Sequence, residues 1–197
     1  MHRWLDWLFP VRADEEIVRA LPLNALAQRT CAYPVFKTRP VATALLPYRD
    51  PEVRATIHEA KYRGSREAFS LLAAALFAHL AQVPATESVR LVPIPLGPAR
   101  HKERGYNQAE EVAKRTGFPL ETGLLERVRE TESQVSLPRR KRAENMRGAF
   151  RAAHRADPTY LYIVFDDVTT TGATLQAAID ALTEAGAEHI LPLALAH

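Results

Sequence analysis

The sequence predicts an α/β fold with a mostly parallel central sheet flanked by helices. Strand-like apolar segments alternate with segments of helical periodicity, most clearly where a strand at 160–165 is followed by a helix at 174–185, with Gly186 past its end, and a strand at 189–196. Strand, helix, strand is the pattern of a parallel sheet with a crossover helix. With 197 residues, 47% of them hydrophobic, the chain can bury the core of one main domain.

The first part of the chain, residues 1–45, is expected to be a small irregular N-terminal extension, ahead of a main domain at 46–197. It shows a short helical pattern near 15–21 and is then interrupted by prolines. The extension begins with four apolar residues: Trp4, Trp7, Leu8 and Phe9. They pack either on the core or on a partner, and the partner could be a second copy of the chain in a homodimer.

The main domain opens with a helix that Ser65 caps, because apolar residues repeat at helical spacing after it, at Phe69, Leu72, Leu76 and Leu80. The other predicted elements, besides the three named above, are a strand at 89–95, a helix from Asn107 closed by Gly117, a short strand at 122–128 and a long basic loop at 129–148.

Charge is concentrated in one place. The chain has a net charge of +3, and from Arg139 to Arg155 seven Lys or Arg residues stand against Glu144 alone. Such a run is either a solvated surface or a contact for an anion, and the residues by themselves leave both interpretations open.

Two features bear on the compartment. No apolar run approaches the roughly 18 residues that a membrane-spanning helix needs, and the N-terminus does not resemble a signal peptide, so a cytoplasmic protein without membrane contact is expected. Cys31 is the one cysteine, which excludes an internal disulfide and a multi-cysteine zinc site and fits a reducing compartment.

The stretch IVFDDVTTTGAT carries the strongest functional signal. Asp166 and Asp167 follow an apolar strand, and a helix begins after the bend. A helix start offers unpaired N–H groups for a phosphate, Gly172 permits close approach, and hydroxyls at Thr170, Thr171 and Thr174 add donors. The acids would repel that phosphate unless they face sugar hydroxyls or a metal. A ribose 5-phosphate meets these needs, whereas the alternative is that these residues only cap a helix and form a turn.

At this point the sequence resembles a family. IVFDDVTTTGAT is similar to the signature of type I phosphoribosyltransferases, which use phosphoribosyl pyrophosphate (PRPP). Two earlier stretches, LVPIPLGPARHKERGYNQAEEVAK and RVRETESQVSLPRRKRAENMRGAF, resemble the ComF competence-protein family and its GntX-type relatives. IHEAKYRGSREAF is similar to the segment that these proteins place before the first strand. The likeness covers roughly residues 45–197.

The resemblance implies a type I phosphoribosyltransferase-like fold and a role for each motif. It implies that Asp166 and Asp167 hold the ribose hydroxyls, with Mg²⁺ bound through PRPP and near these acids. The implied 5-phosphate site is Thr169, Thr170, Thr171, Gly172, Ala173 and Thr174, and the implied pyrophosphate turn is Pro95, Leu96 and Gly97. The alternative for that turn is purely structural: prolines make the end of the strand rigid.

The basic loop is similar to a mobile flap whose cations close over pyrophosphate. The corresponding cations here are Arg139, Arg140, Lys141 and Arg142. Further candidates for contacts with a phosphate or with the acceptor are Arg100, Arg104 and Asn107.

Two departures from the family pattern matter. Thr170 stands where many purine-specific members carry an acid, which argues against that way of handling a purine. Relatives commonly carry a four-cysteine zinc module, whereas this chain has Cys31 alone, so no zinc is expected and residues 1–45 are interpreted as a remnant of that module.

Three classes of function are compared. The first is a PRPP-dependent transferase with an unknown acceptor, linked by resemblance to uptake of transforming DNA. The second is a non-catalytic module that senses PRPP or a nucleotide and contacts single-stranded DNA or a helicase. The third, a metal hydrolase, fits poorly because no further carboxylate or histidine cluster accompanies Asp166 and Asp167.

Overall fold

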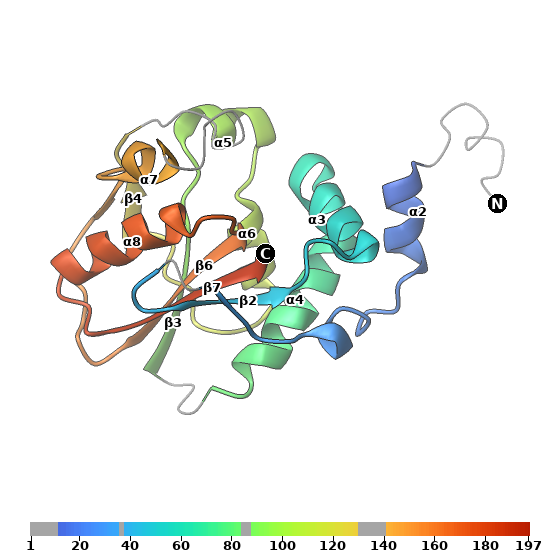
Figure 1. The fold of residues 1–197 in the computed structure, drawn as a ribbon, viewed down its shortest axis with the longest axis horizontal. Coiled ribbons are helices and arrows are strands. Elements are labelled where there is room, and N and C mark those ends of the chain that lie inside the picture. The colour runs from blue at the N-terminus through green and yellow to red at the C-terminus, as the bar shows by residue number, and fades with distance from the viewer. Residues whose placement is uncertain (1–11, 36–37, 84–87, 130–140) are drawn as a thin grey trace.

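The computed structural model describes residues 12–35, 38–83, 88–129 and 141–197 (Figure 1). In chain order its elements are α2 (Ala13–Ala20), η1 (Ala27–Arg29), β1 (Tyr33–Val35), β2 (Ala42–Leu46), α3 (Pro51–Arg63), α4 (Arg66–Leu80), β3 (Val89–Pro93), α5 (Pro98–Arg104), α6 (Gln108–Lys114), β4 (Leu125–Arg127), α7 (Lys141–Met146), β5 (Phe150–Ala152), β6 (Leu161–Val168), α8 (Ala173–Glu184) and β7 (His189–Ala196). Among these described residues, no helix has the length and apolar character needed to cross a membrane.

The central sheet has the strand order β1-β2-β7-β6-β3. Strands β2, β7, β6 and β3 are parallel, and only the edge strand β1 runs antiparallel. In register, Phe165 of β6 lies opposite Pro93 of β3 on one side and Leu193 of β7 on the other. This confirms the predicted α/β fold with a mostly parallel sheet, consistent with a type I phosphoribosyltransferase-like fold.

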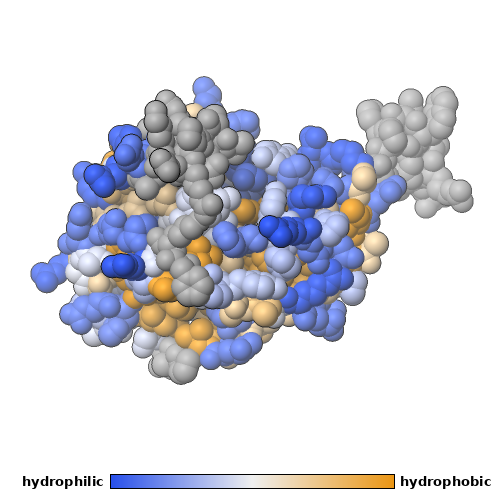
Figure 2. All heavy atoms as spheres, viewed as in Figure 1, coloured by the Kyte–Doolittle hydropathy of each residue, from blue (hydrophilic) through white to orange (hydrophobic). Residues whose placement is uncertain are grey.

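Both faces of the sheet are covered because alternate side chains of each strand point to opposite faces. From β6, Ile163 and Phe165 pack into a core with α3, α4 and α6, whereas Tyr162 and Val164 pack into a second core with α8. Figure 1 shows α8 and α7 on one side of the sheet and α3 and α4 on the other. Polar residues dominate the molecular face drawn in Figure 2, as expected for helices that bury only one side.

Local sequence signals fix several helix boundaries. Asp50 caps α3 through its side chain, which accepts the N–H of Glu52 at 2.8 Å, and Pro51 occupies the first helical turn. Gly64 ends α3 with a φ of 63°. The predicted cap at Ser65 is confirmed, since its side chain accepts the N–H of Ala68. Asn107, predicted as the start of a helix, is the cap of α6, because its side chain accepts the N–H of Ala109.

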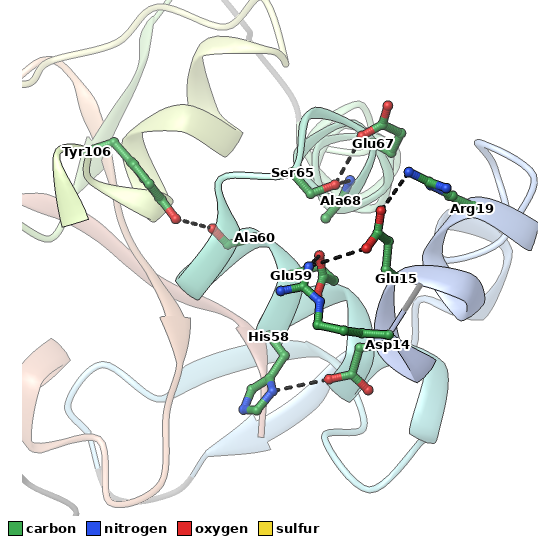
Figure 3. A network of polar contacts seen from close by, with 11 residues as sticks. Asp14, Glu15, Arg19, His58, Glu59, Ala60, Ser65, Glu67, Ala68 and Tyr106 are labelled. Carbon is green, nitrogen blue, oxygen red and sulfur yellow. Dashed lines mark hydrogen bonds and ion pairs between the residues drawn. The ribbon is translucent and has the colours of Figure 1, made fainter. Parts of the chain in front are cut away.

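The N-terminal helix α2 lies beside α3 and is joined to it by polar contacts (Figure 3). Arg12 lies 3.2 Å from the buried carboxylate of Glu59, and Asp14 lies 3.2 Å from His58. Within α2, Glu15 pairs with Arg19 at 2.6 Å. A buried carboxylate such as Glu59 needs a partner, so Arg12 ties the start of α2 to the main body.

Four sequence predictions are corrected. Residues before 45 are not irregular throughout, because β1 and β2 join the central sheet and β2 spans the expected boundary. The strand predicted at 122–128 is shorter in the structure, where β4 covers Leu125–Arg127 and pairs with β5 outside the main sheet. The predicted loop at 129–148 contains α7, and β6 continues through the acid pair to Val168. The division into 1–45 and 46–197 stays a prediction, and Trp4, Trp7, Leu8 and Phe9 lie outside the described residues.

The central position of Phe165 gives a stability test. Its ring is fully buried between the sheet and the α3–α4 layer, so Phe165→Ala should leave a cavity and lower the free energy of unfolding by about 3–5 kcal/mol. Phe77→Ala, at a ring that is 51% exposed on α4, serves as the matched control and should cost less than about 1 kcal/mol. Urea unfolding measures both, and equal costs would contradict the assigned core.

Candidate functional site

A cavity of about 1120 Å³ opens at the carboxyl edge of the parallel sheet. Ligands of open α/β sheets bind at this edge because loops and helix starts converge there. All four parallel strands contribute the residues that follow them: Pro47, Tyr48 and Arg49 after β2, Ile94, Pro95 and Leu96 after β3, Thr169, Thr170 and Thr171 after β6, and His197 after β7.

The acid pair stands at the end of β6 and lines this cavity. The two carboxyls are close enough to interact, since the charge and the side chain of Asp167 both raise the pKa of Asp166. Asp167 faces α3, where its Oδ2 lies 3.6 Å from Lys61 Nζ. Each carboxyl is also held by the backbone, since Asp166 Oδ1 accepts the N–H of Asp167 at 2.9 Å and Asp167 Oδ1 accepts that of Val168 at 2.6 Å. The pair is therefore fixed in place.

Burial sets the protonation of Asp166. Desolvation, followed by the negative charge of Asp167, raises the pKa of Asp166 from its ordinary value of 3.8 to about 8. The N–H of Asp167 and the ammonium of Lys61 act in the opposite direction and do not cancel this effect. Near neutral pH the pair accordingly holds a proton on Asp166, which gives it a donor as well as acceptors.

The threonine loop is anchored at its first residue, Thr169, and runs into helix α8 at its other end. The N–H of Thr169 donates to Ala196 at 3.0 Å, and the Thr169 carbonyl lies 2.9 Å from His197 Nδ1. Gly172 has a φ of 72° and caps α8, a conformation that a residue with a Cβ adopts only with strain. The N–H of Ala173 reaches Thr171 Oγ1 at 3.4 Å. The loop thus turns directly from the strand into the first turn of α8, beside the cavity.

Positive charge exceeds negative charge around the cavity. Among the described residues that line it, Asp166 and Asp167 stand against these cations: Arg49, Lys61, Arg100, Arg104 and Arg127. Low-dielectric walls strengthen the attraction of such a site for anions. The arrangement suits a ligand that is mostly anionic and carries hydroxyls for the two acids.

The structure brings most of the predicted site residues together. Those lining the cavity are Asp166, Asp167, Thr169, Thr170, Thr171, Thr174, Pro95, Leu96, Arg100, Arg104 and Asn107. Gly97 and Gly172 adjoin it as the caps of α5 and α8, and Ala173 begins α8. Arg139 and Arg140 lie outside the described residues. Lys141 and Arg142 begin α7, and the role of their side chains stays a prediction.

The sequence patterns did not predict several residues that line the cavity. Lys61 lies within the quoted motif IHEAKYRGSREAF but is about a hundred residues from the acids, so no local pattern joins them. Arg49, Gln108, Arg127 and His197 also line the cavity. The sequence signal that could have found Arg49 and His197 is their place just beyond a parallel strand.

Metal-ligating groups are sparse in the described part of the chain. It contains no group of three or more His, Cys, Asp or Glu side chains placed to hold a metal ion, and Cys31 is exposed. Asp166 and Asp167 are the carboxyl ligands that the described lining of the cavity offers to a hard cation.

The raised pKa of Asp166 predicts how stability depends on pH. Between 3.8 and about 8 the folded chain keeps a proton that the unfolded chain loses, so the free energy of unfolding falls as pH rises through this range. Asp166→Asn removes this loss. The variant should gain roughly 5 °C in Tm over the parent near pH 9 and much less near pH 5.

Thermal scans at the two pH values measure this difference. Asp180→Asn, at an exposed carboxylate on α8, controls for the loss of one negative charge. A gain that is the same at both pH values would show that Asp166 is ionised in the folded protein.

Comparison with known proteins adds a family relationship. No protein-family model matches the chain. It is 30% identical over 145 residues to the DNA utilization protein YhgH of Salmonella typhi, a match covering 70% of this chain and 63% of that protein. It is 32% identical over 106 residues to Competence protein F of Haemophilus influenzae, covering 51% and 46%, and 30% identical over 134 residues to Competence protein ComFC of Bacillus subtilis, covering 68% and 55%.

These matches therefore span between 46% and 63% of the length of the three relatives. They coincide with the family that the motifs around Asp166 and Arg104 resemble. The chain is a homologue of the ComF-type competence proteins.

Proposed function

We propose that the cavity binds PRPP and that the chain transfers its ribose 5-phosphate to an acceptor, in a role connected with DNA utilization. The observation that carries the proposal is the convergence of an acid pair, a Thr-Gly bend at a helix start and an excess of cations on one cavity. A sugar between two anionic groups matches these three features at once, because the acids need hydroxyls and the cations need phosphates.

The ribose would lie over the acid pair. Its 2- and 3-hydroxyls each donate and accept, and a pair that is half protonated can do both as well. The 5-phosphate would lie on the bend at Thr170–Thr174, where the first turn of α8 offers N–H groups and partial positive charge. Thr171 and Thr174 line the cavity there.

The leaving diphosphate would lie toward α5 and the turn after β3. When the bond between the anomeric carbon and the diphosphate oxygen breaks, the electron pair leaves with pyrophosphate and the ribose carbon becomes positive. The acceptor's lone pair then forms the new bond to that carbon. Fixed cations such as Arg100 stabilise the negative charge that grows on pyrophosphate, and the carboxylate of Asp167 stabilises the positive sugar.

Mg²⁺ fits this site as a partner of the substrate. Mg²⁺ commonly binds through one or two carboxylates together with substrate phosphates, and the described lining of the cavity offers two carboxyls without a third. Asp166 and Asp167 would hold it or the hydroxyls it contacts. When bound, the ion neutralises charge on the diphosphate.

The second candidate is a binding module that contacts DNA. It is favoured by the names of the relatives, DNA utilization protein and Competence protein, together with the cations of the cavity. In this case the same pocket would sense PRPP or a nucleotide, while the basic segment around Arg139–Arg142 contacts single-stranded DNA or a helicase.

The acid pair gives the first test. Asp166→Asn combined with Asp167→Asn should weaken PRPP binding at least roughly tenfold in calorimetric titrations with Mg²⁺, because the sugar hydroxyls lose the charged acceptor of Asp167 and the protonated carboxyl of Asp166. Asp180→Asn with Glu188→Gln removes two exposed negative charges elsewhere and should leave the affinity nearly unchanged. Unchanged affinity in the first variant would contradict the assignment of the acids to the ribose.

A screen of bases and amines then tests for catalysis. Release of pyrophosphate with one of them indicates an enzyme, and PRPP binding without release indicates a sensor.

The basic segment gives a test of the second candidate. If single-stranded DNA binds there, Arg140→Ala with Lys141→Ala should reduce the slope of log affinity against log salt by about 1–2, since each cation displaces roughly one counterion. Arg54→Ala with Arg66→Ala, at exposed sites on α3 and α4, is the matched control. Fluorescence anisotropy at several salt concentrations measures the slope, and equal slopes for both variants would place the contact elsewhere.

A further inference from the structure

The first turn of α8 is held by a residue that does not itself line the cavity. Gln176 lies one turn into the helix, and its backbone N–H donates to the carbonyl of Gly172 at 2.8 Å. Gly172 is the cap of α8, where a φ of 72° turns the bend at Thr170–Thr174 into the helix. The backbone of Gln176 is therefore bonded directly to the bend, although its side chain takes no part in the cavity lining.

The side chain of Gln176 contacts a part of the chain that is distant in sequence. Its Oε1 accepts the N–H of Arg39 at 2.7 Å, and its Nε2 donates to the carbonyl of the same residue at 3.4 Å. Arg39 lies in the β1–β2 connection, of which residues 38–41 are described. In Figure 1 this connection, drawn in blue, lies beside α8. One carboxamide thus pairs both backbone groups of one residue, as a neighbouring strand would.

Asp180 fixes the orientation of this amide. Its Oδ1 lies 2.7 Å from Nε2 of Gln176, and a carboxylate oxygen requires a donor. The N–H of Arg39 requires an acceptor, and Oε1 supplies it. Both neighbours therefore demand the same orientation of the amide, so the side chain of Gln176 has one arrangement in which its oxygen and its nitrogen are both paired.

The β1–β2 connection is itself held firmly. Thr38 is 1% exposed, and its hydroxyl accepts the N–H of Ala42 at 2.7 Å and donates to the carbonyl of Val35 at 3.4 Å. Val35 and Ala42 belong to the same hydrophobic core as Leu175 of α8. Because Thr38 joins the end of β1 to the start of β2, the connection offers Gln176 a fixed point of attachment.

We infer that Gln176 is a positioning residue for the bend at Thr170–Thr174, and that the β1–β2 connection holds it in place. Backbone N–H groups bind a phosphate only while they converge on it, and sites of this kind lose affinity when donors shift by about 1 Å. The segment before residue 45 therefore contributes to anion binding through a contact outside the cavity, since neither Arg39 nor Gln176 lines it. The inference rests on the proposed function, which places the 5-phosphate on this bend.

The test compares two anions that the proposed function places in different parts of the cavity. Gln176→Met keeps the length of the side chain and removes its oxygen and nitrogen. It should weaken ribose 5-phosphate at least roughly fivefold in calorimetric titrations of the full chain, because the bend is held less firmly. Pyrophosphate with Mg²⁺, assigned to the α5 side, should change by less than about twofold. A general loss of stability would not separate the two anions.

A pair of variants tests the contact itself. Gln176→Glu keeps an acceptor for the N–H of Arg39 but brings a second carboxylate against Asp180, so it should weaken ribose 5-phosphate as Gln176→Met does. An asparagine at 180 can accept from the parent glutamine and can also donate to the new carboxylate. Gln176→Glu with Asp180→Asn has the net charge of the parent and should return the affinity to within about twofold of it.

Further controls separate binding from folding. Gln82→Met, at an exposed glutamine after α4, should bind both anions as the parent does. Circular dichroism shows whether each variant is folded at the temperature of the titrations. If Gln176→Met does not fold, the comparison of Gln176→Glu with and without Asp180→Asn decides the question.

Each outcome is decisive. The inference is overturned if folded Gln176→Met binds ribose 5-phosphate within about twofold of the parent, because the contact would then only stabilise the fold. It is also overturned if both anions weaken equally, or if adding Asp180→Asn to Gln176→Glu restores nothing. Failure of the parent to bind either ribose 5-phosphate or PRPP would instead remove the proposed function, and this inference with it.

Discussion

The contact on which the site depends is the pairing of two adjacent carboxyls with one ammonium at the end of β6. Asp166 and Asp167 are partly buried side by side, an arrangement that is unfavourable when both are ionised. Lys61 lies 3.6 Å from Asp167, and burial keeps a proton on Asp166. The chain therefore holds this strained pair by neutralising it, and a ligand that supplies hydroxyls or cations would relieve the same strain.

The fold makes this arrangement possible through connections on opposite faces of the sheet. The α3–α4 layer, between β2 and β3, covers one face and delivers Lys61 to the cavity. Helix α8, between β6 and β7, covers the other face and presents its first turn beside the acids. Because four parallel strands end at one edge, groups far apart in the chain meet there without any long loop of their own.

The parts that could be predicted are those encoded by local pattern. The strand at 189–196, the cap at Ser65, the helix start near Asn107 and the bend at Gly172 each follow from a few neighbouring residues. Strand β2 was missed because prolines surround a short apolar run whose strand character depends on β7, about 150 residues later. Lys61 was missed for the same reason, since its partner Asp167 is set by topology and by no spacing in the sequence.

The two halves of the cavity differ in how their polar groups are satisfied, and this difference has a functional meaning. At the β6 end the carboxyls are held by their own backbone and by Lys61, so their positions are fixed before a ligand arrives. Between α5 and α6 the amide of Gln108 has no hydrogen-bond partner within the described part of the chain, although Tyr106 and Asn107 fix the backbone around it. Specificity gained from a buried unpaired group is large because a wrong ligand leaves it unpaired.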